Sequence, residues 1–202
     1  MRRSGLVMMA LAGMLGAAAG CHSNSVDQSA FKTAINSYYS GKQDCVWATP
    51  VKFPAQADTS KEDQTEGFDA LTDAGLLVRK TAEKSRFLIG SKQVNDYDLS
   101  DKGRSTWTAD ANEPGYGNFC YGHLTVNSID GYTPADPNAG QYTVSYHYGV
   151  SGIPDWANSA EMKTAFPRIA ADSSGQHAAT ASLAKSGNGW QVDSVQPPVP
   201  GT

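Results

Sequence analysis

The fold is decided first by the stretch QYTVSYHYGV (residues 141–150), in which apolar and polar side chains alternate without a break. An alternation of period two is typical of a β-strand with one buried face. That face carries Tyr142, Val144, Tyr146, Tyr148 and Val150. The stretch therefore predicts a strand with an aromatic side, which is either a core beneath a helix or a platform for a ligand.

Three further extended segments surround this strand in the sequence. They are Phe119–Val126, Ala179–Ala184, and the segment from Trp190 to Val195 that follows the turn Ser186-Gly-Asn-Gly189. A Gly-rich turn between two alternating segments indicates a hairpin. We therefore expect a four-stranded antiparallel meander over residues 111–196, with a short helix at 158–165 closed by Pro167 and a flexible tail at 197–202.

The preceding part of the chain has a different pattern. Phe31 and Ile35 recur at helical spacing, which predicts a helix over about 26–40. Pro50 and Pro54 favour extended chain around 45–53, and the polar residues 55–64 are expected to form a loop. A helix at 66–74 is expected to end at Gly75. Two strands, 77–81 and one ending at Leu99, should then lead to a short helix that begins at Ser100.

The series from Leu71 through Ala74-Gly75-Leu76-Leu77 and Arg79 to Tyr97-Asp98-Leu99-Ser100-Asp101-Lys102-Gly103-Arg104 resembles winged-helix domains. The resemblance spans about residues 26–107 and implies a helix, a two-stranded wing and a following helix. We therefore predict an α+β protein with a winged-helix-like subdomain at 26–110. Acidic and basic residues are equal in number over 65–105, so a nucleic-acid partner is not expected.

The first twenty residues are typical of a secretory signal. Arg2 and Arg3 precede an apolar stretch from Gly5 to Ala18, and small residues lead directly to Cys21. The segment Ala18-Ala19-Gly20-Cys21 resembles the lipobox of bacterial lipoproteins, although Ala18 stands where family members more often have Leu. The resemblance implies cleavage after residue 20 and acylation of Cys21. The alternative is an ordinary cleaved signal that ends beside a cysteine.

Acyl chains on Cys21 would anchor the protein to the lipid bilayer without a transmembrane helix. Residues 21–25 would then form a lipidated tether. The resemblance also implies sorting to the outer membrane, facing the periplasm, because His22 stands where Asp would favour inner-membrane retention. Loss of Arg2 and Arg3 changes the formal net charge from −4 to −6, which argues against polybasic lipid contacts and nucleic acid.

Two of the three cysteines remain when Cys21 is assigned to lipid. In an oxidising periplasm, Cys45 and Cys120 are expected to form one disulfide, with two free buried thiols as the alternative. The segments Phe119-Cys-Tyr-Gly122, Pro154-Asp-Trp156 and Ala165-Phe-Pro167 make the chain resemble a family of uncharacterised proteobacterial lipoproteins. That resemblance implies a lipoprotein with two parts and no assigned activity.

Motifs for catalysis are weak. Ser29-x-x-Lys32, Tyr116-x-Asn118 and Lys185-Ser-Gly187 occur in the order found in penicillin-recognising enzymes, but Ser-x-x-Lys is expected about once by chance in this composition. No catalytic residue is therefore assigned, and a serine hydrolase is only a remote alternative.

Metal motifs are also weak. His123 and His147 lie on expected strands without a metal-binding spacing, and the segment from Asp96 to Ser100 starts like a calcium loop but lacks its Gly and Glu. We therefore assign no metal site and no cofactor.

These observations favour a membrane-anchored envelope lipoprotein that acts as a non-enzymatic protein-interaction or inhibitor-like module, with an envelope protein as its partner. The alternative is a periplasmic small-ligand-binding lipoprotein, with Tyr142, Tyr146 and Tyr148 as the ligand face.

Overall fold

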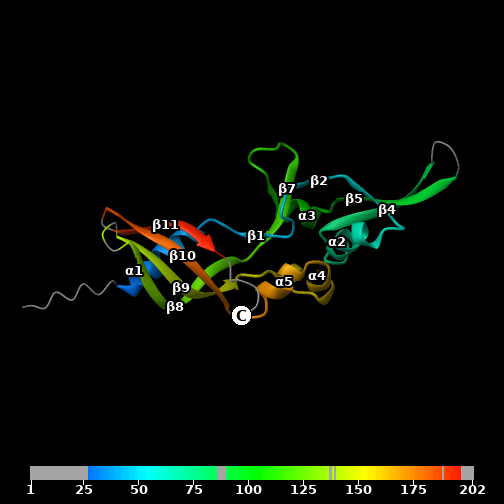
Figure 1. Ribbon diagram of the computed structural model, residues 1–202. Helices are drawn as coiled ribbons and strands as arrows, with labels where there is room; N and C mark the ends of the chain where they lie inside the picture. The colour runs from blue at the N-terminus through cyan, green and yellow to red at the C-terminus, as the bar shows by residue number, and fades with distance from the viewer. Residues whose placement is uncertain (1–26, 86–89, 137, 139, 188, 197–202) are drawn as a thin grey trace, which may run out of the picture.

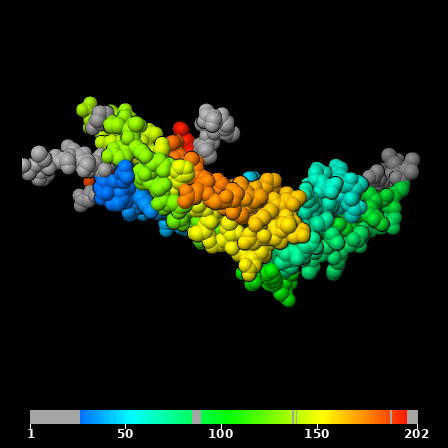
Figure 2. Space-filling view, turned by 90° about the horizontal axis from the view of Figure 1, so that it is seen from below, coloured from blue at the N-terminus to red at the C-terminus, as the bar shows by residue number. Residues whose placement is uncertain are grey.

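The computed structural model describes residues 27–85, 90–136, 138, 140–187 and 189–196, and these form an elongated body with two lobes (Figures 1 and 2). One lobe, the sheet lobe, contains the first helix and the last four strands. The other, the hairpin lobe, ends in a long β-hairpin. Helices and mainly antiparallel sheets are both present, which confirms the α+β prediction.

In the sheet lobe, a four-stranded antiparallel sheet has the order β11-β10-β9-β8, so that consecutive strands pair. The elements are α1 (Gln28–Tyr39), β8 (His123–Asp136), β9 (Gln141–Ser151), β10 (His177–Ser186) and β11 (Gly189–Gln196). Helix α1 packs on one face of this sheet and buries Phe31 and Ile35 completely. The Phe31 ring lies 4.8 Å from the Trp190 ring, so aromatic contacts join helix and sheet.

The hairpin lobe is built on a three-stranded antiparallel sheet of order β3-β5-β4. Its elements are β3 (Ala55–Asp58), α2 (Glu62–Asp73), β4 (Leu77–Ser85), β5 (Ser91–Leu99) and α3 (Asp101–Thr106). The expectation of a loop at 55–64 is wrong for its first four residues, because Ala55 and Ala57 pair with Tyr97 and Asn95 of β5. Pairing with a distant strand here overrides a weak local propensity.

The end of α2 follows the sequence pattern closely. Gly75 has a φ of +76°, and the Leu76 N–H donates to the Leu71 carbonyl oxygen at 2.9 Å. Leu76 is fully buried, so this left-handed turn sends the chain from the helix directly into the core. The helix begins at Glu62, four residues before the expected start at 66.

A small sheet around strand β7 joins the two lobes. Strand β7 (Tyr116–Tyr121) pairs with β1 (Asp44–Cys45), β2 (Val51–Lys52) and β6 (Trp107–Ala109). Three short helices share a hydrophobic core with β7, α2 and β4. They are η1 (Asp155–Ala157), α4 (Ala160–Ala165) and α5 (Pro167–Asp172). The short helix α4 ends at Ala165, directly before Phe166 and Pro167, as the sequence predicts. Pro167 also starts a further helix, which was not predicted from the sequence. It is the first residue of α5, where a missing N–H costs nothing.

The two hydrophobic cores divide the chain differently from the expected boundary at residue 110. Phe31 and Ile35 belong to the core of the sheet lobe, whereas Phe119, Met162 and Ile169 belong to the core with α2 and β4. The physical reason is that α1 is the helix that covers the apolar face of the β8–β11 sheet. A helix close to the start of the described chain therefore packs on strands close to its end.

One glycine shows how closely α3 approaches the hairpin sheet. A Cβ atom on Gly103 would lie 1.9 Å from the Leu76 carbonyl oxygen, whereas one on Gly131 would meet nothing within 4 Å. Gly103→Ala is therefore expected to lower the free energy of unfolding by about 1–3 kcal/mol. Chemical denaturation measures this, with Gly131→Ala as the matched control that should change it by less than about 1 kcal/mol. Equal effects of the two substitutions would show that the close approach is absent in solution.

Candidate functional site

The cavity with the clearest ligand-site features lies between the lobes, just beyond the end of α1. It has a volume of about 360 Å³. Its floor takes one residue from each strand of the large sheet: Leu124, Tyr148, Ala179 and Val195. Because α1 ends at Tyr39, the helix leaves this end of the apolar sheet face uncovered, and Tyr39 itself forms a wall.

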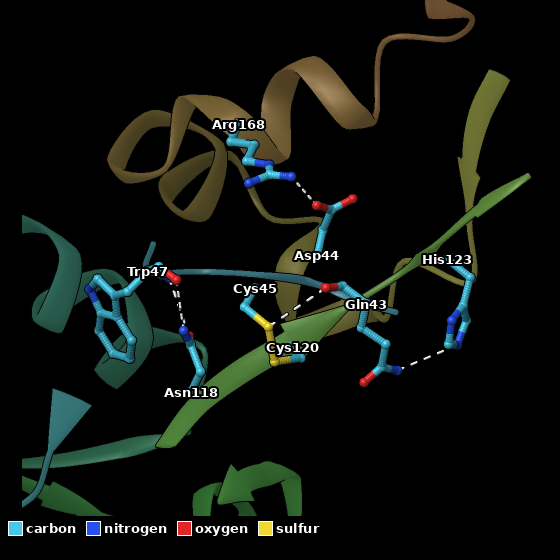
Figure 3. The surroundings of a disulfide bond; sticks show 8 residues. All are labelled: Gln43, Asp44, Cys45, Trp47, Asn118, Cys120, His123 and Arg168. Carbon is cyan, nitrogen blue, oxygen red and sulfur yellow. Dashed lines mark hydrogen bonds and ion pairs between the residues drawn. A yellow bond between two sulfur atoms is a disulfide. The ribbon is translucent and has the colours of Figure 1, made fainter. Parts of the chain in front are cut away.

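The rim of the cavity is polar and comes mainly from two segments far apart in the chain. Lys42, Gln43 and Asp44 follow α1, whereas Arg168 and Asp172 lie on α5. The Arg168 guanidinium forms an ion pair with Asp44, which Figure 3 shows, and its Nε lies 3.9 Å from Asp172. These two contacts tie α5 to the segment that leads into β1.

A tyrosine hydroxyl completes this ion-pair group. Tyr121, at the end of β7, donates to the Asp172 carboxylate at 2.7 Å. Burial, and then this hydrogen bond to Asp172, raise the pKa of Tyr121 well above its usual range. The hydroxyl therefore stays protonated and acts as a permanent donor to Asp172.

Burial also raises the pKa of Asp44, and the neighbouring Asp172 adds to the effect while Arg168 opposes it. Burial raises the pKa of Tyr39 and of Tyr148 for the same reason. The side chains of Asp44 and Asp172 are largely buried, so their charges interact with Arg168 more strongly than charges at the open surface do.

A disulfide holds Asp44 in place beside the cavity (Figure 3). Cys45 and Cys120 lie directly opposite each other in the β1–β7 pair and are joined at an S–S distance of 2.03 Å, as the sequence predicts. Next to them, the Asn118 amide donates to the Trp47 carbonyl and accepts from the Trp47 N–H. These contacts fix the backbone of β1 on β7.

The three tyrosines expected as a ligand face have different surroundings. Tyr146 is fully buried and its hydroxyl lies 3.1 Å from that of Tyr39. Tyr142 packs against Phe31 and Trp190 under α1. Only Tyr148 of the three lines the cavity, and the centre of its ring lies 5.3 Å from that of the His177 ring. Most of the aromatic stripe is thus core.

The residues of the penicillin-enzyme motif have structural partners. The Ser29 hydroxyl donates to Asp27, the N-cap of α1, and the Lys32 ammonium donates to the Asn127 carbonyl. Asn118 contacts Trp47 next to the other core, and Lys185 pairs with Trp190 in the β10–β11 hairpin. Ser29 and Lys32 therefore serve the cap and the helix–sheet contact.

The candidate metal residues are also separated. His123 lies 3.4 Å from the Gln43 amide, whereas His147 contacts Asp130 at 2.6 Å. Asp96 accepts from Gln56, and Ser100 caps α3. Within the described ranges, no group of three His, Cys, Asp or Glu side chains is placed to hold a metal ion.

A second hollow, of about 480 Å³, lies between α2 and α4 in the hairpin lobe. Its lining combines acidic residues with small residues such as Ala70 and Ala160. The acidic residues are Glu62, Glu66, Asp69, Asp73 and Glu161. Asp69 is paired with Arg79, so the remaining four carboxylates define the charge of this surface.

Sequence reasoning missed the ion-pair group of Asp44, Tyr121, Arg168 and Asp172. Arg168 and Asp44 are 124 positions apart, so no local spacing brings them together. The one available signal was Pro167, because proline is favoured at the first position of a helix and so indicates α5.

Comparison of the chain with protein-family profiles, with curated proteins and with solved structures finds no match. Within the described residues, none of the helices is both long and apolar enough to cross a bilayer.

Arg168→Ala is expected to lower the free energy of unfolding by about 1–3 kcal/mol at pH 7, since it leaves two largely buried carboxylates without their counter-charge. Without the guanidinium, the pKa of Asp44 rises further above its unfolded value. The loss of stability in Arg168→Ala is therefore present at neutral pH. It becomes smaller as the pH falls through the raised pKa of Asp44 in the folded state, because the carboxylate is then protonated.

Denaturation of wild type and variant at pH 7 and at about pH 4 measures this difference. Lys163→Ala on α4 is the control, because Lys163 forms no ion pair with any described residue. A loss in Arg168→Ala that is the same at both pH values would contradict the electrostatic explanation.

Proposed function

We propose that this protein is a lipid-anchored envelope lipoprotein that holds a protein partner at the end of the molecule farthest from the membrane, without catalysing a reaction. The single observation that carries the proposal is the position of the two ends. Helix α1 starts at one end of the body, and the β4–β5 hairpin forms the other (Figure 1).

The attachment point follows from the short distance between Cys21 and α1. Asp27 caps the helix six residues after Cys21, and a chain of that length spans at most about 20 Å. An acylated Cys21 would therefore keep the sheet lobe close to the bilayer, which we propose is the periplasmic face of the outer membrane. The hairpin lobe would then project into the periplasm.

Two features of the hairpin lobe suit protein recognition. Strand β4 lies at the edge of its sheet, and Val78 on it is 46% exposed. An edge strand has backbone groups that an extended segment of a partner can pair with. The acidic hollow between α2 and α4 lies in the same lobe and favours a basic partner surface.

We propose that the hairpin lobe is a winged-helix-like scaffold used for protein contact. In support, the β4–β5 hairpin follows α2, α3 follows the hairpin, and β3 pairs with the inner strand β5. Acidic and basic residues are nearly equal in number on the two strands, four basic against three acidic, with Lys80 opposite Asp96 and Lys84 opposite Lys92. A DNA-reading wing needs a net positive face, so this charge balance favours a protein partner.

The anchor is tested by Cys21→Ala in cells labelled with palmitate. The variant is expected to lose the label and to move from the membrane fraction to the soluble fraction, since the thiol that carries the acyl chains is gone. Cys45→Ala, which leaves Cys21 intact, should keep the label. Membrane retention of unlabelled Cys21→Ala would overturn the anchor.

The orientation is tested by photo-crosslinking in living cells. A photoreactive residue at Val78 is expected to capture a periplasmic protein, and the same residue at the exposed Asp193 of the sheet lobe is not. Val78→Glu should weaken capture from a second photoreactive position at Lys80, because it places a charge on the exposed edge. Capture from Asp193 and none from the hairpin would contradict the proposal.

A further inference from the structure

The cavity beyond α1 has the construction of a ligand site rather than of a packing defect. Its floor is apolar, with Leu124, Ala179 and Val195, and its charged groups come from the segment after α1 and from α5. Its volume of about 360 Å³ falls within the range of about 300–1,000 Å³ that is usual for small-molecule sites.

In the rim, the two acidic side chains are more deeply buried than the arginine that pairs with them. The side chains of Asp44 and Asp172 are only 18% and 12% exposed, and both face the same guanidinium. That of Arg168 is 65% exposed, so it lies at the outer side of the group. Two largely buried carboxylates thus share one cation that is mainly in solvent.

Lys42, the other cation of the rim, contacts an aromatic ring. The Lys42 ammonium lies 3.3 Å from the centre of the Tyr38 ring, a cation–π contact outside the carboxylate group. Tyr121 donates a hydrogen bond to Asp172 but brings no charge. The described lining residues include two acids and two bases, but Lys42 is engaged with Tyr38. Both carboxylates therefore share the single charge of Arg168, which leaves this group of three with one excess negative charge.

Burial makes this excess charge costly, because a carboxylate away from water requires a positive partner or protonation. The raised pKa of Asp44 agrees with such a cost. A ligand with a positive charge would remove this cost, because it supplies the missing partner of the carboxylates. The tyrosines Tyr39 and Tyr148 at the same cavity add aromatic surface, which also favours an organic cation.

We propose that this cavity binds a small organic ammonium ion, with its ammonium group donating to Asp44 and Asp172 and its apolar part on the floor of Leu124, Ala179 and Val195. The site lies between the lobes and shares no lining residue with β4 or with the acidic hollow that we propose for the protein partner. The two inferences are thus separately testable.

The test is isothermal titration of the full-length protein in nanodiscs, with the heat for empty nanodiscs subtracted. Three probes share one apolar body and differ in charge: 2-phenylethylammonium, 2-phenylethanol and phenylacetate. We expect saturable binding of the ammonium ion, at least about tenfold weaker binding of the alcohol, and no binding of the anion. Hydrogen bonds to charged groups are the stronger ones, which explains this order.

Two variants locate the binding. Asp172→Asn keeps an acceptor for Tyr121 but removes one charge. It should therefore weaken binding of the ammonium ion at least about tenfold. Asp130→Asn is the matched control, because Asp130 pairs with His147 away from the cavity, and it should leave the affinity unchanged. Ala179→Leu fills the floor and should abolish binding of every probe.

Thermal unfolding of each variant shows that it is folded, and Asp44→Asn replaces Asp172→Asn if that variant is not. The proposal is overturned if the alcohol binds as tightly as the ammonium ion. It is equally overturned if removal of either carboxylate leaves the affinity unchanged, or if 2-phenylethylammonium shows no saturable binding to the wild-type protein.

Discussion

The structure depends on the bend between β7 and β8, where the chain passes from the core of the hairpin lobe to the core of the sheet lobe. Strand β7 buries Phe119 and Tyr121 in the hairpin-lobe core, and β8 buries Val126 in the sheet-lobe core. Only Gly122 lies between these strands. It has a φ of +62°, and a Cβ atom there would lie 2.4 Å from the Val150 side chain. The bend thus requires glycine, and it sets how the two lobes meet.

Two further links stand beside this bend and hold the lobes at that angle. The Cys45–Cys120 disulfide joins β1 to β7 two positions before Gly122, and Arg168 ties α5 to Asp44. The bridge closes a loop of 75 positions, so it removes much conformational freedom from the unfolded chain. The cavity lies where these links meet the uncovered end of the large sheet. Its shape therefore depends on long-range contacts rather than on any local motif.

Sequence patterns predicted those elements whose side chains follow a clear period or a required turn. The alternation at 141–150 became β9, the helical spacing of Phe31 and Ile35 became α1, and Gly75 ends α2 in the left-handed conformation. They failed for β3, whose strand conformation comes from its pairing with β5. They also failed for the cavity, since Asp44 and Arg168 are ordinary surface residues by sequence and become a pair only in the folded chain.

By itself, the sequence determined the α+β class and the segments able to form strands, whereas the pairing of Cys45 with Cys120 was an expectation that the fold confirmed. The class and these segments depend on side-chain periodicity and residue type, which act over a few positions. Only the tertiary structure decided that α1 covers the sheet of β8–β11, and that this helix ends before the sheet does. The reason is that helix packing is set by matching apolar faces across the whole chain. The uncovered end of that sheet, with two carboxylates beside one arginine, is a result of that match.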